Sequence, residues 1–358
     1  MAVMVHLLIG EQRAYQREFG ASRKGARGRQ AEALRARAVP GILIAVMTPS
    51  LGRGRSFALA LRCIGAMASL AQLAIAAPGD QPHSTSARRW MEMTAEERQA
   101  HLADSTTSSS LAVRLERMSE GFLGTPYLAS PLGEGTGKDP DPLIRFDAVD
   151  CLTFVEESIA LALGRSSDEV ERLLTEIRYF NRPIFSERNH LLEAQWIPHN
   201  IRKGFLREAT RRLGGDATRQ VWKQIDERAW SSPSARALGL VGDERPMGRF
   251  ALSVIGLEEL LAIAPRLESG TVLVIVREDR AFSPTRVSHV GFVIQKGRRT
   301  YLRHATRTLG RVVDEELASF VARNAKYDRR KVVGASLFDV AQPGQGVPSG
   351  TADLAPLR

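Results

Sequence analysis

One cysteine and two histidines are the residues of this chain whose types and spacing could support covalent catalysis. Cys151 follows Asp150 at the start of a run typical of an amphipathic helix, and His289 and His304 flank a short turn between two apolar runs. Backbone N–H groups at a helix N-terminus stabilise negative charge and favour a thiolate there. A thiolate, an imidazole base and a second polar group that orients the base could together cleave an acyl bond. The alternative for Cys151 is a small buried apolar side chain, which is the commoner fate of a free cysteine.

The two histidines lie on β-branched runs that we expect to form a hairpin. These runs are Val287–Gln295 and Arg299–Ala305. A two-residue turn at Lys296-Gly297 places His289 opposite His304 on one face of the hairpin, and this is the predicted register. A turn at Gly297-Arg298 would instead place Thr306 opposite His289. In the predicted register His289, at the strand start, is the expected base and His304 the orienting group.

Two other interpretations of these residues remain open. Each histidine taken singly could be an ordinary strand residue with its ring hydrogen bonds satisfied. Cys151, His289 and His304 could also bind zinc, but the chain places them far apart, without the close CxxC or HxxxH spacing of common zinc sites. We therefore expect no metal and no other cofactor.

The surrounding pattern predicts an α+β protein, with helices in the first half and strands after about residue 250. Ser110 is a plausible cap for a helix that follows it, and Ser166 with Glu169 resembles a capping box. Leu152, Val155, Ile159 and Leu163 predict one buried face on the cysteine helix. Further expected helices are Leu111–Phe122, Ser166–Phe180, Phe205–Leu213 and Asp216–Trp230, and a further expected strand is Thr271–Val276.

The net charge of +10 arises mostly from the beginning of the chain. Residues 1–76 carry eleven Lys and Arg against three Glu, a surplus of eight, so the remainder is close to +2. Such a balance leaves no basic surface for nucleic acid. Arg53, Arg55 and Arg62, an apolar run and Ala74-Ile75-Ala76 together predict a cleaved signal peptide that starts at Met47. The apolar run is too short to span a bilayer.

This composition divides the chain into five expected segments. We interpret 1–46 as a mis-called start or a basic extension, 47–76 as the signal peptide, and 77–110 as a polar N-terminal segment. A catalytic domain should span 111–340, with a helical part at 111–235 and a β part at 250–340. The Pro/Gly/Ala-rich tail, 341–358, is expected to be disordered. After export the mature protein would be periplasmic or extracellular, and its only cysteine would be Cys151.

Four motifs follow one another along the chain: Gly124-Thr125-Pro126-Tyr127, Asp150-Cys151, Ser288-His289-Val290-Gly291 and His304. Their order resembles that of the NlpC-type papain-like cell-wall hydrolases. The chain is more closely similar to the bacterial family of N-acetylmuramoyl-L-alanine amidase-like proteins, over about residues 110–340. Gln195–Asn200 and the stretch ending in Arg323-Asn324 also match segments of that family. The resemblance implies a papain-like fold in which the cysteine helix packs on an antiparallel sheet or small barrel.

The resemblance also implies roles for individual residues. Cys151 would be the nucleophile, His289 the base and His304 the third catalytic residue. Tyr127 would lie beside the cysteine and help to bind the oxyanion, although a core aromatic is an equal alternative. The expected substrate-binding residues are Tyr127, Asp150, Trp196, Asn200 and Ser288, of which Asp150 could instead be a helix cap and Trp196 a core residue.

The implied activity is hydrolysis of an amide bond in peptidoglycan or muropeptide fragments. The bond would be the lactyl-amide bond to L-alanine or a bond within the stem peptide, and the residues rank neither above the other. The alternatives are a non-catalytic wall-binding protein on the same fold and a zinc-dependent hydrolase. The residues indicate no nucleic-acid partner and no membrane span after signal cleavage, and they leave the oligomeric state open.

Overall fold

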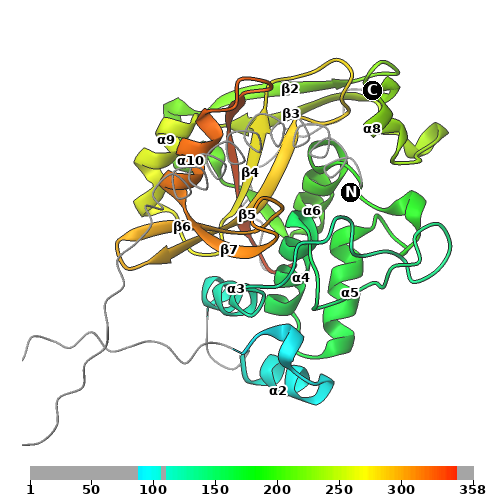
Figure 1. The fold of residues 1–358 in the computed structure, drawn as a ribbon, viewed down its shortest axis with the longest axis vertical. Coiled ribbons are helices and arrows are strands. Elements are labelled where there is room, and N and C mark those ends of the chain that lie inside the picture. Colours follow the sequence, from blue (N-terminus) through cyan, green and yellow to red (C-terminus); the bar gives the residue numbers. More distant parts are fainter. Residues whose placement is uncertain (1–87, 106–109, 345–358) are drawn as a thin grey trace, which may run out of the picture. The chain divides into compact units, whose positions relative to one another are not determined.

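A computed structural model describes residues 88–105 and 110–344 of the chain (Figure 1). The predicted extension 1–46, the predicted signal peptide 47–76 and all but the first four residues of the predicted tail lie outside the described residues. Within the described ranges, no helix is both long enough and apolar enough to cross a membrane.

The described chain is an α+β protein built on an antiparallel sheet. Six strands pair in the order β1-β8-β4-β5-β6-β7, and β2 pairs with β3 in a separate two-stranded sheet. The strands are β1 (Leu206–Glu208), β2 (Arg219–Ile225), β3 (Gly248–Val254), β4 (Val272–Arg277), β5 (Val287–Lys296), β6 (Arg299–Thr306), β7 (Arg311–Glu316) and β8 (Val332–Val340).

Helices precede these strands and lie between them along the chain. The α-helices are α2 (Ala95–Ser105), α3 (Leu111–Glu120), α4 (Cys151–Leu163), α5 (Ser167–Arg178), α6 (Ile197–Lys203), α7 (Thr210–Gly214), α8 (Pro233–Arg236), α9 (Leu257–Ile263) and α10 (Leu317–Ala325). The shorter helical turns are η1 (Trp90–Glu92), η2 (Phe185–Glu187), η3 (Leu192–Trp196), η4 (Gly215–Ala217), η5 (Ala229–Ser231), η6 (Gly242–Glu244) and η7 (Ala264–Arg266). Of these turns, η3 is a π-helix that runs directly into α6.

Helices cover both faces of the central sheet, as the positions of α4 and α10 relative to β4 and β5 indicate (Figure 1). Side chains alternate between the two faces of a strand. Val272 and Val274 of β4 pack in the core that contains α4, whereas Leu273 and Ile275 pack in the core that contains α9 and α10. Strand β4 is therefore apolar from Val272 to Val276, because neither of its faces meets solvent.

Helix α4 is enclosed on every side. All thirteen of its residues are buried, including Glu156 and Glu157. The predicted single apolar face, Leu152 to Leu163, is therefore an incomplete description. Phe154 adds an edge-to-face contact with Phe292 of β5, with ring centroids 5.7 Å apart. The helix that starts at Cys151 therefore lies inside the core and has no solvent-exposed face.

Most predicted elements near the cysteine and histidines are confirmed. Helix α3 begins after Ser110, whose hydroxyl accepts a hydrogen bond from the Val113 N–H. Helix α5 begins after Ser166, whose hydroxyl accepts a hydrogen bond from the Glu169 N–H. The predicted capping box is incomplete, because the Glu169 carboxylate accepts from the Arg165 N–H at 2.9 Å. Strands β4, β5 and β6 match the three predicted strands to within one residue at each end.

Three predictions in the helical half were wrong. The segment Phe205–Leu213, expected to be one helix, contains strand β1 and forms helix α7 only from Thr210, because β1 pairs with β8. Residues 216–230 form strand β2 and short turns where we expected a helix, because β2 pairs along its whole length with β3. Tertiary pairing of this kind overrides local propensity. Phe180, expected on the buried face of the α5 segment, lies beyond the end of that helix and is 54% exposed.

The hairpin that carries the histidines has the alternative register. Lys296 pairs with Arg299 and Phe292 pairs with Arg303, so the two-residue turn is Gly297-Arg298. The predicted turn at Lys296-Gly297 was wrong because Gly297, with φ of +58°, occupies the first turn position and supplies the positive φ that tight hairpins require. The shift is two residues, and an even shift leaves every side chain on its predicted face.

Candidate functional site

Cys151 is the first residue of α4, and its position is fixed by a full capping box. The Asp150 carboxylate accepts hydrogen bonds from the N–H groups of Leu152 and Thr153, at 3.0 and 2.9 Å, while the Thr153 hydroxyl accepts one from the Asp150 N–H. The second carboxylate oxygen of Asp150 accepts from Ser130 N–H at 3.1 Å. Asp150 therefore holds the helix start, with both oxygens in use, and the structure offers no position for it against a substrate.

The thiol of Cys151 lies where backbone donors converge. Backbone N–H groups of Val290 and Cys151 near the sulfur favour its ionised form, with a smaller contribution from Leu152, whose N–H donates to Asp150. Burial opposes them, and together with the neighbouring Asp150 carboxylate it raises the pKa of the thiol well above its ordinary value. This direction is opposite to the lowered pKa that a helix N-terminus alone predicts. The resting site therefore holds a neutral thiol.

His289 and His304 meet although they are not paired directly across the hairpin. The Nε2 atom of His289 lies 2.5 Å from the Nδ1 atom of His304, and the two rings are nearly perpendicular at 81°. Diagonal residues on one face of a sheet are close enough for long side chains to touch. Burial lowers the pKa of both imidazoles, and for His289 the proximity of His304, Arg323 and Arg277 lowers the pKa further.

A β-bulge directs His289. Ile275 pairs with His289 and Val276 pairs with Val287, so Ser288 is the extra residue on β5. Bulges of this kind often re-aim a side chain near a functional site. The Ser288 hydroxyl is buried and accepts a hydrogen bond from Arg277 Nε at 2.8 Å. Ser288, predicted to bind substrate, instead anchors the bulge.

Cys151 and the histidines are brought together through one strand. Val290, whose backbone N–H favours the ionised form of the thiol, directly follows His289 on β5. Among the described residues, no hydrogen bond joins the sulfur to either imidazole ring. Catalytic hydrogen bonds are often long before substrate binds, so this geometry is compatible with a thiol–imidazole pair.

Tyr127 lies between the cysteine segment and the β6–β7 turn. Its backbone forms a bridge with Val149, and its N–H donates to the Gly310 carbonyl at 2.8 Å. The phenol oxygen is buried without a hydrogen-bond partner among the described residues. Burial and the proximity of Cys151 raise the pKa of Tyr127, so the phenol stays protonated. An unused O–H donor near the nucleophile is what an oxyanion site requires.

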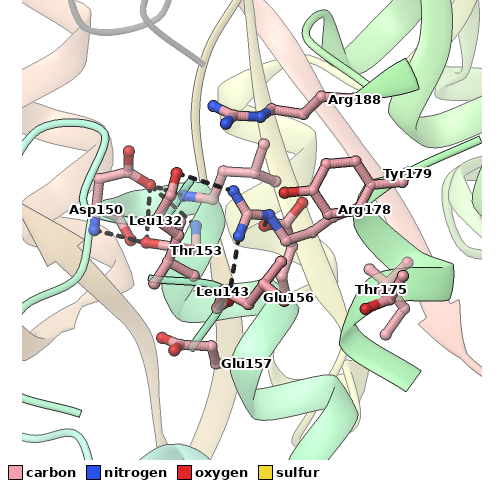
Figure 2. A network of polar contacts seen from close by, with 12 residues as sticks. Leu132, Leu143, Asp150, Thr153, Glu156, Glu157, Thr175, Arg178, Tyr179 and Arg188 are labelled. Carbon is pink, nitrogen blue, oxygen red and sulfur yellow. Dashed lines mark hydrogen bonds and ion pairs between the residues drawn. The ribbon is translucent and has the colours of Figure 1, made fainter. Parts of the chain in front are cut away.

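A buried ionic network joins α4 to α5 and to the loop before Cys151 (Figure 2). The Arg178 guanidinium lies 3.2 Å from the Glu156 carboxylate and donates to the carbonyl oxygens of Leu132 and Leu143. Burial raises the pKa of Glu156 to about 7 despite this arginine. Burial also raises the pKa of Glu157 well above its ordinary value. The network ties the loop before Cys151 to α5.

Two further predicted substrate-binding residues are core residues. Trp196 and Asn200 are both fully buried. The Trp196 indole N–H is directed toward Glu156 and lowers the pKa of that carboxyl, while the Asn200 amide donates to the carbonyl oxygens of Ile177 and Trp196. Neither side chain lies on a surface that a substrate could reach, so both are corrected to structural residues that join α6 to α5.

Sequence reasoning missed the acidic residue next to the histidine pair. Glu315 Oε2 lies 3.2 Å from His304 Nε2 and 2.6 Å from Arg323 Nη2. Strand β7, which ends at Glu316, had not been predicted, and the only available signal was its run of acidic residues after Val312-Val313. Among the described residues, no group of three or more His, Cys, Asp or Glu is arranged to hold a metal ion.

The sequence model of the AmiA-like family, described as N-acetylmuramoyl-L-alanine amidase-like, matches residues 117–327. The chain belongs to this family. The match contains Tyr127, Cys151, His289, His304 and Glu315, so every residue of the candidate site lies within the part of the chain that defines an AmiA-like protein. No curated protein matches the chain.

Two solved structures resemble this AmiA-like protein in fold. One is a protein from Legionella pneumophila, 21% identical, with a TM-score of 0.61 over 69% of this chain and 96% of that chain. Another is an N-acetylmuramoyl-L-alanine amidase from Bacteroides uniformis, also 21% identical, with a TM-score of 0.52 over 65% of this chain and 100% of that chain. At this identity the likeness concerns the fold alone.

Proposed function

We propose that the protein is a cysteine hydrolase that cleaves an amide bond in peptidoglycan. The observation that carries the proposal is the position of Cys151 at the start of α4, against the strand that carries the bonded pair His289 and His304. Membership of the amidase-like family supports peptidoglycan as the substrate class. The same arrangement supports a papain-like, NlpC-type interpretation of the fold.

The reaction would proceed in two halves. As the sulfur attacks the amide carbonyl, His289 takes the thiol proton, a C–S bond forms and the carbonyl oxygen becomes an oxyanion. The Tyr127 phenol donates to that oxyanion. Collapse of the intermediate breaks the C–N bond, and the His289 imidazolium protonates the leaving amine. Water then attacks the thioester while His289 accepts its proton, and a carboxylic acid and the free thiol are released.

The pKa directions decide when the proton moves. Burial raises the pKa of the Cys151 thiol and lowers the pKa of the His289 imidazole. Both groups are therefore neutral at rest, and no stored thiolate–imidazolium pair is expected. The proton is transferred during attack, so His289 acts as a general base in the bond-forming step.

Digestion of purified muropeptides followed by mass spectrometry tests the proposal. The parent protein should release either an intact stem peptide, from cleavage of the lactyl-amide bond, or a shortened stem, and the masses identify the bond. Cys151→Ala should release neither. Cleavage by Cys151→Ala at the parent rate would refute the cysteine mechanism. Tight muropeptide binding without cleavage by the parent would favour the non-catalytic wall-binding alternative.

Export is a separate part of the proposal. A substrate in the cell wall requires a protein outside the cytoplasm, and Arg53, Arg55, Arg62 with Ala74-Ile75-Ala76 supply a signal peptide pattern. N-terminal sequencing of the protein from its native host should begin near Ala77. A mature protein that still begins before Met47 would contradict export by this signal.

A further inference from the structure

The histidine pair continues into a longer row of polar contacts that ends on α10. His289 Nε2 meets His304 Nδ1 at 2.5 Å, His304 Nε2 meets Glu315 Oε2 at 3.2 Å, and Glu315 accepts two hydrogen bonds from Arg323, at 3.1 and 2.6 Å. His304 faces a different partner with each of its two ring nitrogens, His289 with Nδ1 and Glu315 with Nε2. The proton positions of the row are therefore linked.

The proton positions in this row are set first by Glu315, whose carboxyl group is ionised. Burial would raise the pKa of its carboxyl, but the two hydrogen bonds from Arg323 and the His304 ring nitrogen 3.2 Å away outweigh burial and lower the pKa to about 2. A carboxylate is an acceptor only, so His304 Nε2 must carry the proton. In a neutral His304 the other nitrogen, Nδ1, is then an acceptor and takes a hydrogen bond from His289 Nε2–H. A neutral His289 is left with its lone pair on Nδ1.

The opposite tautomer would place two acceptors against each other. If His304 carried its proton on Nδ1, its unprotonated Nε2 would face the Glu315 carboxylate at 3.2 Å. This leaves a buried acceptor facing the carboxylate without a donor between them, which favours the first tautomer by about tenfold or more.

Helix α10 holds the acidic end of the row rigidly. The Arg323 guanidinium binds Glu315 through two nitrogens and lies over the Phe320 ring at 5.2 Å. The same Phe320 ring contacts both imidazoles, with centroids 6.0 Å from His289 and 5.6 Å from His304. A paired, stacked arginine of this kind is pre-organised. Glu315 therefore has a fixed position relative to both histidines.

We propose that Glu315, held by Arg323, is a positioning residue that fixes the tautomer of His304 and, through it, makes Nδ1 of His289 the atom that accepts the thiol proton. This inference deepens the proposed function and rests on it. It assigns to Glu315 and Arg323 a role that neither Cys151 nor the histidine pair can perform.

Two substitutions of Glu315 distinguish the effect of its negative charge from the effect of its hydrogen-bond acceptor. Glu315→Gln keeps an oxygen acceptor for His304 and removes the charge, whereas Glu315→Leu removes both. Glu316→Gln and Glu316→Leu are matched controls, because Glu316 is the next residue and takes no part in the row. The full-length chain is labelled with nitrogen-15 in its imidazole rings, and His289→Gln and His304→Gln variants assign the resonances.

The expected result is graded. In the parent, both imidazoles should show a protonated Nε2 and an unprotonated Nδ1 at pH 8. In Glu315→Leu, both tautomers should be populated, with kcat on muropeptides roughly 10- to 100-fold lower and KM within about twofold of the parent. Glu315→Gln should fall between the two, and both Glu316 variants should match the parent. Loss of stability alone would not produce a tautomer mixture.

A parent-like tautomer in Glu315→Leu would overturn the inference, as would a parent-like kcat in that variant. The nitrogen-15 measurement needs no substrate. If the parent cleaves no muropeptide, the proposed function fails while the tautomer result still decides the role of Glu315. If the parent cleaves muropeptides and the tautomers do not respond, only the inference about Glu315 and Arg323 fails.

Discussion

Gly291 and His304 lie so close across β5 and β6 that no side chain fits between them. A methyl group on Gly291 would come within 2.9 Å of the His304 Cβ and within 2.7 Å of the Arg303 carbonyl oxygen. Because Gly291 has no side chain, the His304 side chain has room to contact its diagonal neighbour His289. Glycine in a strand interior often marks such a close approach.

Substitution of Gly291 should therefore displace the orienting histidine. Gly291→Ala should lower kcat at least tenfold and lower the free energy of unfolding by about 1–3 kcal/mol through overpacking. Gly297→Ala is the control, because its φ of +58° should cost about 1–2 kcal/mol while open space surrounds it. Kinetics and denaturant unfolding of both variants test this. Equal kcat values in the two variants would contradict the role assigned to Gly291.

The two histidines should contribute unequally to turnover. His304→Ala should lower kcat and leave KM largely unchanged, because an orienting group helps the base without replacing it. His289→Ala should cause a larger loss of kcat. Steady-state kinetics on one purified muropeptide compares the two variants. A loss in His304→Ala that equals or exceeds the loss in His289→Ala would reverse the assignment of base and orienter.

Tyr127 should act through its hydroxyl alone. Tyr127→Phe should lower kcat on the order of 100-fold, the usual effect of removing one oxyanion donor. Its stability should stay level or rise slightly, since the phenol oxygen is buried without a partner among the described residues. Tyr179→Phe is the matched control: its hydroxyl bonds Gly133 and Glu134, so this variant should lose about 1 kcal/mol of stability and keep its kcat. Unchanged kcat in Tyr127→Phe would make Tyr127 a core aromatic.

Glu157 should make the fold less stable as pH rises. Its pKa in the folded protein is raised above the ordinary value of 4.5 by burial, so the folded state holds the proton more tightly than the unfolded state. The stability from this proton is complete below pH 4.5 and is lost as pH rises toward the folded pKa, with a slope of up to about 1.4 kcal/mol per pH unit. Glu156, with its pKa raised to about 7, contributes in the same direction up to that pH.

Glu157→Gln should flatten this dependence, because the amide keeps the acceptor for the Arg145 N–H and has no proton to lose. Glu171→Gln, an exposed substitution on α5, should leave the slope unchanged. Urea unfolding at several pH values between 5 and 8 measures both. If Glu157→Gln and the parent share one slope, Glu157 is ionised in the folded protein.

The sequence alone predicted the cysteine helix and the two histidine strands of the site correctly, but it did not predict the register of the β5–β6 hairpin. The helix start at Asp150-Cys151 and the two strands around His289 and His304 are set by local sequence patterns. Such patterns can be recognised without knowledge of the tertiary contacts. The register depended on whether Gly297 stands first or second in the turn, and Lys-Gly and Gly-Arg are both weak turn signals. The observed register differs from the predicted one by two residues, so His289 and His304 remain on the same face of the hairpin. They meet as diagonal neighbours, whereas the predicted turn placed them directly opposite each other.

Burial and partners beyond the hairpin could not be predicted in the same way. Trp196, Asn200 and Ser288 are polar or aromatic residues near recognisable motifs, and only the packing of α6 and the bulge on β5 shows that they point inward. Glu315 reaches His304 through the pairing of β6 with β7, a non-local contact without a motif of its own. Strand β2 was missed because its stability comes from β3 and not from its own composition.

The enclosure of α4 also determines how the chain can vary. A helix with one solvent face tolerates substitution in a repeating pattern, about every third or fourth residue, and α5 with its exposed Glu171 and Arg172 should follow that pattern. Helix α4 has no such face, so a complete substitution scan should show intolerance at every position from Cys151 to Leu163. The nucleophile would then lie on the segment that tolerates the fewest substitutions. Changes of substrate preference among descendants of this chain would therefore have to arise in the loops around α4.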